Sequence, residues 1–173
     1  MKILAVSDKK EAKFLRQKTA LIDFIHSKKS ELRQLIREMR QAMKKADGVG
    51  LSANQVGKSL RLFVAEVPAG AKGKENKFYT IINPEIVKAS EETTNLEEGC
   101  LSVPETFGLV ERPEKITITG LDMNGRKIKI KAWGLLARVF QHEVDHLNGI
   151  LFIDKAKDIK TVPSKSTNSG SRQ

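Results

Sequence analysis

The longest amphipathic stretch of the chain predicts a helix over residues 30–46. Apolar residues recur at helical spacing from Leu32 to Met43, with charged residues between them. Ser30 and Glu31 are typical of a helix start, as a cap followed by an acidic residue in the first turn. The methionines of this stripe could line a groove for a partner, but a stripe buried against a core is the commoner arrangement.

Alternating apolar and polar positions predict strands through the middle of the chain. The pattern favours strands at 60–67, 78–82, 86–87, 115–121 and 127–132, with a shorter strand-like run at 101–104. The sequence Asp-Met-Asn-Gly at 122–125 is typical of a hairpin turn. Residues 89–95 are polar, and we expect them to be exposed.

A second helix is predicted at 135–147, where apolar residues again recur at helical spacing. Gly149 is placed to end this helix in a left-handed backbone conformation. A short closing strand is expected at 150–153. Beyond it the chain turns polar, and residues 161–173 are expected to form a flexible C-terminal tail.

The N-terminal residues 1–29 have no clear period. We expect them to form an extended arm that is anchored on the core by apolar side chains. The candidates for this role are Phe14, Leu15, Leu21, Ile22, Phe24 and Ile25.

Composition narrows the class of protein. The 173 residues are 39% hydrophobic and 30% charged, which fits one soluble globular domain with a sizeable core. No apolar run is long enough to span a membrane, and charge follows the short apolar N-terminus at once, unlike a signal peptide. The single cysteine, Cys100, excludes an intrachain disulfide and fits a reducing compartment, so we expect a cytoplasmic protein.

The chain is strongly basic, with a formal net charge of +10 from 31 lysines and arginines against 21 acidic residues. Such a charge attracts polyanions such as ribosomal RNA, although lysines spread over the surface of a protein from a lysine-rich proteome are the alternative. Aromatic residues make up only 5%, too few for a platform that stacks bases. We therefore expect a loose electrostatic association with the ribosome and no sequence-specific nucleic-acid binding.

The segment that carries chemistry is Gln-His-Glu-Val-Asp-His at residues 141–146. His142 and His146 lie on one face of the predicted helix, so both imidazoles can bind a single metal ion. Glu143 lies one step round the helix, where it could take a proton from a metal-bound water. Two ordinary surface histidines are the alternative, but with 3 histidines in the chain this spacing rarely arises by chance.

Two histidines need a third ligand, and Cys100 is the strongest candidate. A lone cysteine is more often a small buried hydrophobe, but this one follows two acidic residues and a glycine. Beyond His146 the sequence has no His, Cys or Glu, so the downstream glutamate of thermolysin-type proteases is missing. Only Asp154 and Asp158 could serve as ligands on that side.

Small residues and glycines gather at 48–57. Such residues let a ligand lie close to the backbone. A phosphate-binding loop is excluded, because no Gly-Lys-Ser/Thr follows. A plain loop is the alternative. The small size and low charge of the run favour a wall that faces the substrate, in which Gln55 offers a neutral amide donor.

Three blocks of the sequence, in this order, closely resemble the signature motifs of the peptide deformylase family. They are Gly-Val-Gly-Leu-Ser-Ala-Asn-Gln at 48–55, Glu-Gly-Cys-Leu-Ser at 98–102 and Gln-His-Glu-Val-Asp-His-Leu at 141–147. The similarity runs from about Leu15 to Asp154.

The chain also departs from the family pattern. Ser52 stands where alanine is usual, and Phe107 stands where some members carry an arginine that helps to hold the peptide. A Pro-Asp-Pro-type stretch is absent near the N-terminus. The polar tail is unlike the long C-terminal helix by which some members dock on ribosomes.

The resemblance implies a compact α+β fold, in which a central His-Glu-x-x-His helix is surrounded by antiparallel or mixed strands. Residues 1–160 would form the deformylase-like catalytic domain. The implied activity is that of a metal-dependent hydrolase acting on linear amides. It would remove the N-formyl group from the N-terminal formylmethionine of nascent polypeptides and release formate. Another metallohydrolase, such as a peptidase or deacetylase, and a non-enzymatic ribosome-associated protein are the alternatives.

The resemblance also implies roles for single residues. Cys100, His142 and His146 would bind one Fe²⁺ ion, and mixed thiolate and imidazole ligation would also accept Zn²⁺, Ni²⁺ or Co²⁺. Glu143 would be the general base.

Other residues would act on the substrate or on the ligands. The Gln55 amide and the Leu101 backbone N–H would stabilise charge on the formyl oxygen. The expected substrate wall consists of Gly48, Val49, Gly50 and Val139, with Leu101 beside the methionine side chain. For Val49, Leu101 and Val139, plain core packing is an equal alternative. The candidates for orienting the metal ligands are Glu98, Arg112 and Asp145, for which surface ion pairing is an equal alternative.

Overall fold

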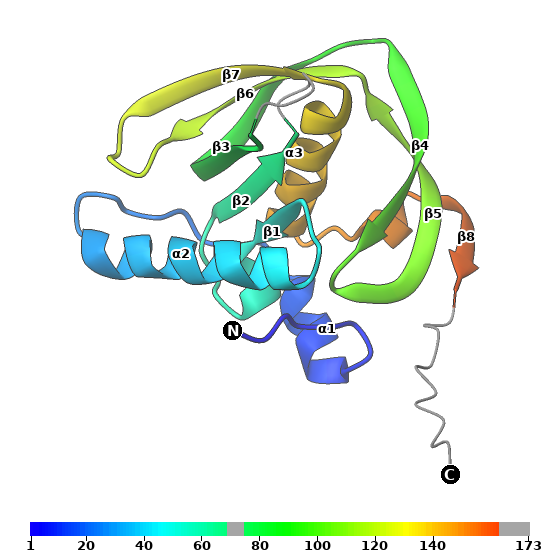
Figure 1. The fold of residues 1–173 in the computed structure, drawn as a ribbon, viewed down its shortest axis with the longest axis horizontal. Coiled ribbons are helices and arrows are strands. Elements are labelled where there is room, and N and C mark those ends of the chain that lie inside the picture. Colours follow the sequence, from blue (N-terminus) through cyan, green and yellow to red (C-terminus); the bar gives the residue numbers. More distant parts are fainter. Residues whose placement is uncertain (69–74, 163–173) are drawn as a thin grey trace.

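The computed structural model describes residues 1–68 and 75–162. Helix α3 stands in the middle of the molecule, between a five-stranded and a three-stranded sheet (Figure 1). In chain order the elements are α1 (Lys9–Leu15), α2 (Lys29–Lys45), β1 (Gly50–Ser52), η1 (Ala53–Val56), β2 (Leu62–Val67), β3 (Lys77–Ala89), β4 (Thr93–Cys100), β5 (Val103–Pro113), β6 (Lys115–Leu121), β7 (Lys127–Trp133), α3 (Gly134–Leu147), η2 (Phe152–Asp154) and β8 (Lys157–Thr161).

Both sheets are antiparallel throughout, so the expected α+β fold is confirmed. The larger sheet has the order β1-β2-β3-β6-β7, and the smaller has the order β4-β5-β8. The predicted hairpin joins β6 to β7. Its turn is closed because the Asp122 side chain accepts the backbone N–H groups of Asn124 and Arg126, at 2.8 and 2.9 Å.

Strand β2 is buried along its whole length, because a helix covers each of its faces. Successive side chains of a strand point to opposite faces of the sheet. Phe63 therefore packs in the apolar cluster that contains Phe140 of α3. Leu62 and Val64 pack in the cluster that contains Met39 of α2. This strand thus fixes where α3 stands relative to α2.

Helix α2 has the buried methionine stripe that the sequence predicts. Met39 and Met43 are both 0% exposed. The start of the helix differs from the prediction, because Lys28 occupies the N-cap position and makes no side-chain capping bond. Ser30 therefore lies within the first turn and is not the cap.

The predicted extended arm is wrong over α1, which is helical. The Asp8 side chain caps this helix by accepting two backbone N–H groups of its first turn. A helix of 7 residues is too short to show a period in the sequence. Of the expected anchors, Leu15 and Ile22 are buried, whereas Leu21 and Ile25 are 72% and 88% exposed.

Strand β3 is continuous where the pattern predicts two strands. The interruption is a register shift between Ile82 and Glu85, with Asn83 at a positive φ of 51°. Such a bulge bends a strand without ending it. Strand β4 begins at Thr93, inside a segment expected to be only polar and exposed, and it pairs with β5 along its length.

The predicted closing strand at 150–153 is wrong, because this apolar run forms the 3₁₀ helix η2. The Asp154 side chain accepts the Leu151 N–H at 2.8 Å and closes the turn. Leu151 and Phe152 are buried in a small cluster with Val110 of β5. The run is apolar because it is buried, not because it is a strand.

Only two residues of the expected tail at 161–173 lie in the described part of the chain. Thr161 is the last residue of β8, and Val162 follows it. None of the helices in the described ranges is long and apolar enough to cross a membrane.

The end of α3 provides a test of this packing. Gly149 has φ +77°, as predicted, and a Cβ there would lie 2.3 Å from the Arg16 carbonyl oxygen. Gly57 has φ +75° with nothing within 4 Å of its added Cβ. Gly57→Ala should cost only backbone strain, about 1–2 kcal/mol. Gly149→Ala adds the clash and should lower the free energy of unfolding by about 2–5 kcal/mol in denaturant titrations. Equal losses in the two variants would contradict this account.

Candidate functional site

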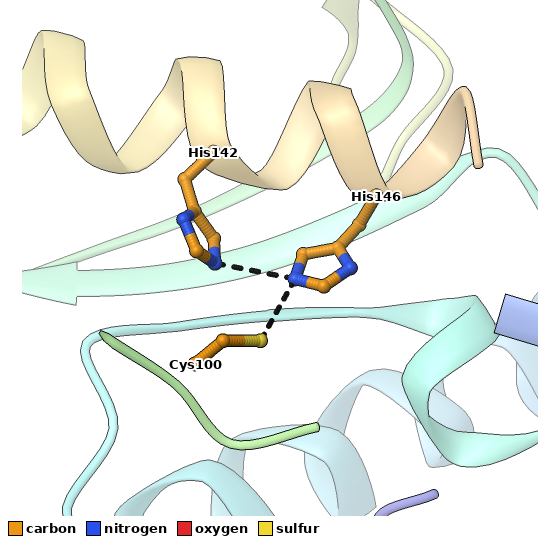
Figure 2. Close-up of side chains that lie close together, drawn as sticks. All are labelled: Cys100, His142 and His146. Atoms are coloured by element: carbon orange, nitrogen blue, oxygen red, sulfur yellow. Dashed lines mark hydrogen bonds between the residues drawn. The ribbon is translucent and has the colours of Figure 1, made fainter. Parts of the chain in front are cut away.

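Three side chains that are candidates for metal ligation converge in the structure (Figure 2). The Cys100 Sγ lies 3.1 Å from the His146 Nε2, which lies 3.2 Å from the His142 Nε2. One ligand atom from each residue lies within 4.8 Å of the others. His142 and His146 lie one turn apart on α3, and Cys100 ends β4 opposite them.

The local backbone explains why the thiol points at the helix. The β4–β5 register is regular as far as Gly99 and shifts at Cys100, which pairs with Val103. The shift turns the end of β4 out of the plane of the ladder. The Ser102 backbone N–H then donates to the Cys100 Sγ at 3.4 Å, and the Gln55 side-chain amide approaches it at 3.6 Å.

The chemistry of the three donors fits a divalent transition-metal ion. The His142 Nδ1 lies 3.0 Å from the Glu98 Oε2 and donates to this carboxylate, so Nε2 is the nitrogen that faces the other candidate ligands. A soft thiolate with two imidazoles suits Zn²⁺, Fe²⁺, Co²⁺ or Ni²⁺. Within the described residues, no other group of three such side chains converges in this way.

Charge in the site favours binding of a cation. Burial disfavours a Cys100 thiolate, but the imidazoles of His146 and His142 outweigh it and hold the pKa of the thiol well below its ordinary value. Burial also lowers the pKa of His142, but Cys100 and Glu98 outweigh it and raise that pKa to about 10. A bound divalent ion would replace the positive charge that protonated imidazole supplies here.

Glu143 is buried beside the three candidate ligands. Its Oε2 accepts a hydrogen bond from the Ser52 hydroxyl, which also lies 3.2 Å from the Glu143 backbone oxygen. Burial raises the pKa of the Glu143 carboxyl, against the opposing effect of the His142 and His146 imidazoles. A Cβ on Gly50 would lie 2.3 Å from the Glu143 Oε1, so only glycine leaves room for this carboxylate.

Behind the ligands lies a buried charged network. The Arg112 Nε and Nη2 donate to the two oxygens of Glu98 at 2.6 and 2.9 Å, and its Nη1 donates to Asp145 at 2.8 Å. The Arg112 and Glu98 side chains are 3% and 6% exposed, so the alternative of surface ion pairing is wrong. Burial acts to raise the pKa of Glu98, but Arg112 and His142 outweigh it and hold this pKa well below its ordinary value.

A cavity of about 480 Å³ opens on the site. Among the residues that line it are all four of the expected substrate wall, Gly48, Val49, Gly50 and Val139, together with Gln55 and Leu101. The Gln55 Oε1 accepts the Ser52 backbone N–H at 2.9 Å, which turns the amide nitrogen toward Ser102 and Cys100. The wall predicted at 48–57 therefore includes strand β1 and the short helix η1 rather than only a loop.

Comparison with known proteins identifies the family. The polypeptide deformylase family profile matches residues 1–162. The chain belongs to the polypeptide deformylase family. A peptide deformylase of Thermomicrobium roseum is 43% identical over 150 residues, which cover 86% of this chain and 83% of the relative.

Solved structures agree with this assignment. The crystal structure of a probable peptide deformylase from Synechococcus phage S-SSM7 matches with a TM-score of 0.80 at 40% identity, covering 90% of this chain and 99% of the other. The Synechococcus elongatus peptide deformylase in complex with actinonin matches with a TM-score of 0.80 at 39% identity, covering 91% and 81%. The chain is therefore an enzyme of the deformylase class, which excludes the non-enzymatic alternative.

The structure of this deformylase places two further residues at the site that the sequence analysis did not single out as functional. Ser52, noted only as a departure from the family motif, contacts the Glu143 carboxylate. Arg138 is buried and donates to Glu98 at 2.7 Å. Arg138 lies four residues before His142, so both side chains are on one face of the helix. This spacing could have identified Arg138 from the sequence. Phe107 lies on the cavity wall, with its ring against Gly99.

The buried network predicts a large cost for losing Arg112. Arg112→Met removes the cation that Glu98 and Asp145 share. Arg138 and Lys155 still contact these carboxylates, so the free energy of unfolding of the deformylase should fall by about 3 kcal/mol, the lower end of the usual loss for a broken buried pair. Arg16→Met is the matched control, because Arg16 pairs with Asp154 at 2.6 Å but both side chains are about a third or more exposed. It should cost about 1 kcal/mol or less. Similar losses in both variants, measured in denaturant, would contradict this prediction.

Proposed function

We propose that this deformylase removes the N-formyl group from the N-terminal formylmethionine of newly synthesised polypeptides and releases formate. The observation that carries the proposal is the convergence of Cys100, His142 and His146, with ligand atoms within 4.8 Å of one another, beside the buried Glu143 carboxylate. This arrangement suits hydrolysis of an amide by an activated water.

In this proposal Cys100, His142 and His146 hold one divalent ion, with Fe²⁺ as the native metal on the family resemblance. Such an ion lowers the pKa of a water molecule and polarises a carbonyl group. Glu98 keeps the proton of His142 on Nδ1 and so keeps Nε2 available as a ligand. Arg112 holds Glu98 in the required orientation through two hydrogen bonds.

Glu143 moves the protons. One of its oxygens is held by Ser52, and the other lies over Gly50 on the cavity wall. It takes a proton from the attacking water and passes it to the leaving amine of the methionine. The same carboxylate serves both steps because its position beside the reacting atoms does not change.

Two donors would stabilise the charge that develops on the formyl oxygen. They are the side-chain amide of Gln55 and the backbone N–H of Leu101, both on residues that line the cavity. One such donor is typically worth about 2.7–4 kcal/mol in the transition state. The hydrogen bond from the Ser52 N–H to Gln55 fixes the amide before substrate arrives.

The wall around Gly50 supports a preference for the formyl group. Gly50 is in close contact with Glu143, and Gly48 with Leu101, whose Cδ1 would lie 2.8 Å from an added Cβ. A formyl group is the smallest acyl group, so a site this narrow disfavours bulkier ones. Val49 and Val139 are proposed to flank the methionine side chain.

The proposed partners are nascent N-formylmethionyl peptides. Loose electrostatic attraction to the ribosome, from the net charge of +10, is part of the same proposal. So is a cytoplasmic location, which the single cysteine of the chain favours. Residues 1–160 are proposed as the catalytic domain.

The substrate test uses formyl-Met-Ala-Ser and acetyl-Met-Ala-Ser with protein prepared and loaded with Fe²⁺ without oxygen. Formate should be released from the first peptide, and acetate should not be released from the second at a comparable rate. Metal analysis should give one ion per chain. Equal turnover of the two peptides, or full formate release after removal of the metal with a chelator, would overturn the proposal.

Replacing the base should separate chemistry from metal binding. Glu143→Gln removes the proton acceptor but keeps the side-chain shape, so kcat should fall by about 10²–10⁴-fold with metal content unchanged. Glu97→Gln is the matched control, because Glu97 lines the same cavity without contacting the three ligands. It should keep most of the wild-type kcat. A Glu143→Gln enzyme with wild-type kcat would show that another group transfers the proton.

A further inference from the structure

The metal ligands come from two sides of a seam between α3 and the β4–β5 hairpin. His142 and His146 belong to α3, which packs on the five-stranded sheet through the apolar cluster around Phe140. Cys100 belongs to β4. Within the described residues, that cluster contains nothing from β4 or β5, and the small cluster around Val110 of β5 contains nothing from α3. The seam is therefore not held by an apolar core.

Polar side chains cross the seam instead. The Gln141 amide of α3 donates to the Pro113 carbonyl oxygen at 2.9 Å, and the other contacts are made by charged groups. Arg138 of α3 is 7% exposed, and within residues 1–68 and 75–162 its guanidinium donates only to groups on the hairpin. Its Nη1 lies 2.7 Å from the Glu98 Oε1 and 2.9 Å from the Val110 carbonyl oxygen. Its Nη2 lies 2.8 Å from the Thr94 carbonyl oxygen and 3.1 Å from the Thr94 Oγ1. One guanidinium thus ties the helix to both strands of the hairpin.

Glu98 connects this contact to the ligands. Arg138 binds one oxygen of the carboxylate, and His142, one helical turn further along, faces the other at 3.0 Å. Arg112 approaches Glu98 from β5 and reaches α3 only through Asp145, which lies after His142. The two arginines therefore hold α3 on opposite sides of His142, and Arg138 is the one that the helix itself supplies.

We propose that Arg138 is a positioning residue for the metal centre. It sets the distance and orientation of α3 relative to β4, so that the His142 Nε2 and the Cys100 Sγ can bind one cation. A positive charge at position 138 is not sufficient to hold the two elements in place. A lysine there would offer a single ammonium group, which cannot reach the four acceptors on the hairpin. The inference rests on the proposed function only in requiring that the three ligands bind a metal ion.

The test measures the metal centre rather than turnover. Zn²⁺ affinity is obtained by competition with a chelator, and the visible spectrum of the Co²⁺-loaded protein reports the geometry of the thiolate and imidazole ligands. Arg138→Met should weaken Zn²⁺ binding by about 10–100-fold and change the Co²⁺ spectrum. Arg138→Lys should show a smaller loss of the same kind.

The matched control is Arg40→Met. Arg40 also joins a helix to a strand through a glutamate, donating to Glu66 at 2.8 Å, but Glu66 contacts none of the three ligands. The Arg40 side chain is 42% exposed and Lys44 also pairs with Glu66, so this variant should lose less stability than Arg138→Met and keep the wild-type Zn²⁺ affinity and Co²⁺ spectrum. An equal loss of affinity in Arg40→Met would show that general destabilisation is the cause, and the inference would fail.

The remaining outcomes are also decisive. Wild-type affinity and spectrum in Arg138→Met would overturn the inference and leave the proposed function intact. If the wild-type protein itself binds no Zn²⁺ or Co²⁺, both fail together. If Arg138→Met does not fold, Arg138→Lys takes its place, and wild-type metal binding by that variant overturns the inference.

Discussion

The site depends on holding one helix at a fixed distance from a hairpin that it does not contact through an apolar core. His142 and His146 are fixed to α3, and α3 is fixed by apolar packing on the five-stranded sheet. Cys100 is fixed to the end of β4, in the other sheet. The buried charges of Arg112, Glu98 and their partners span the gap. Buried ion pairs add little net stability, but their hydrogen bonds fix the relative orientation of the side chains they join. Side chains that must converge on one point require such a fixed orientation.

The same buried charges orient a candidate metal ligand and join two parts of the fold. Glu98 accepts from His142 on one side and from Arg112 and Arg138 on the other. Its carboxylate therefore selects the tautomer of a ligand and joins the helix to the hairpin. Ser52 and Gly50 do the equivalent for Glu143, one by donating a hydrogen bond and the other by leaving space. His142 and Glu143, both proposed to take part in the chemistry, are thus each positioned by buried neighbours.

Patterns in the sequence predicted the elements that depend on interactions between residues close in the chain. Helical spacing located α2 and α3, alternation located β2, β6 and β7, and the spacing of His142 and His146 placed two imidazoles on one face. The missed features are of two kinds. Helix α1 is local but, at 7 residues, too short to show a period, and the others depend on contacts between elements. Strand β5 gains its regularity from pairing with β4, and the apolar run at 150–153 is a turn buried under that hairpin. The sequence assigned no role to Arg138, because its acceptor Glu98 lies 40 residues earlier and only the fold brings the two together.

Chain order adds a kinetic consequence. The thiol lies at position 100, and the second imidazole follows 46 residues later. The β5 strand that supports them gains its last partner only with β8, at 157–161. Pairings that distant form slowly, and domains generally fold as units during synthesis. On the proposed function, the polypeptide would acquire its cation during translation only after nearly all of its described length has emerged, and it would act on other nascent chains only once its own synthesis is almost complete.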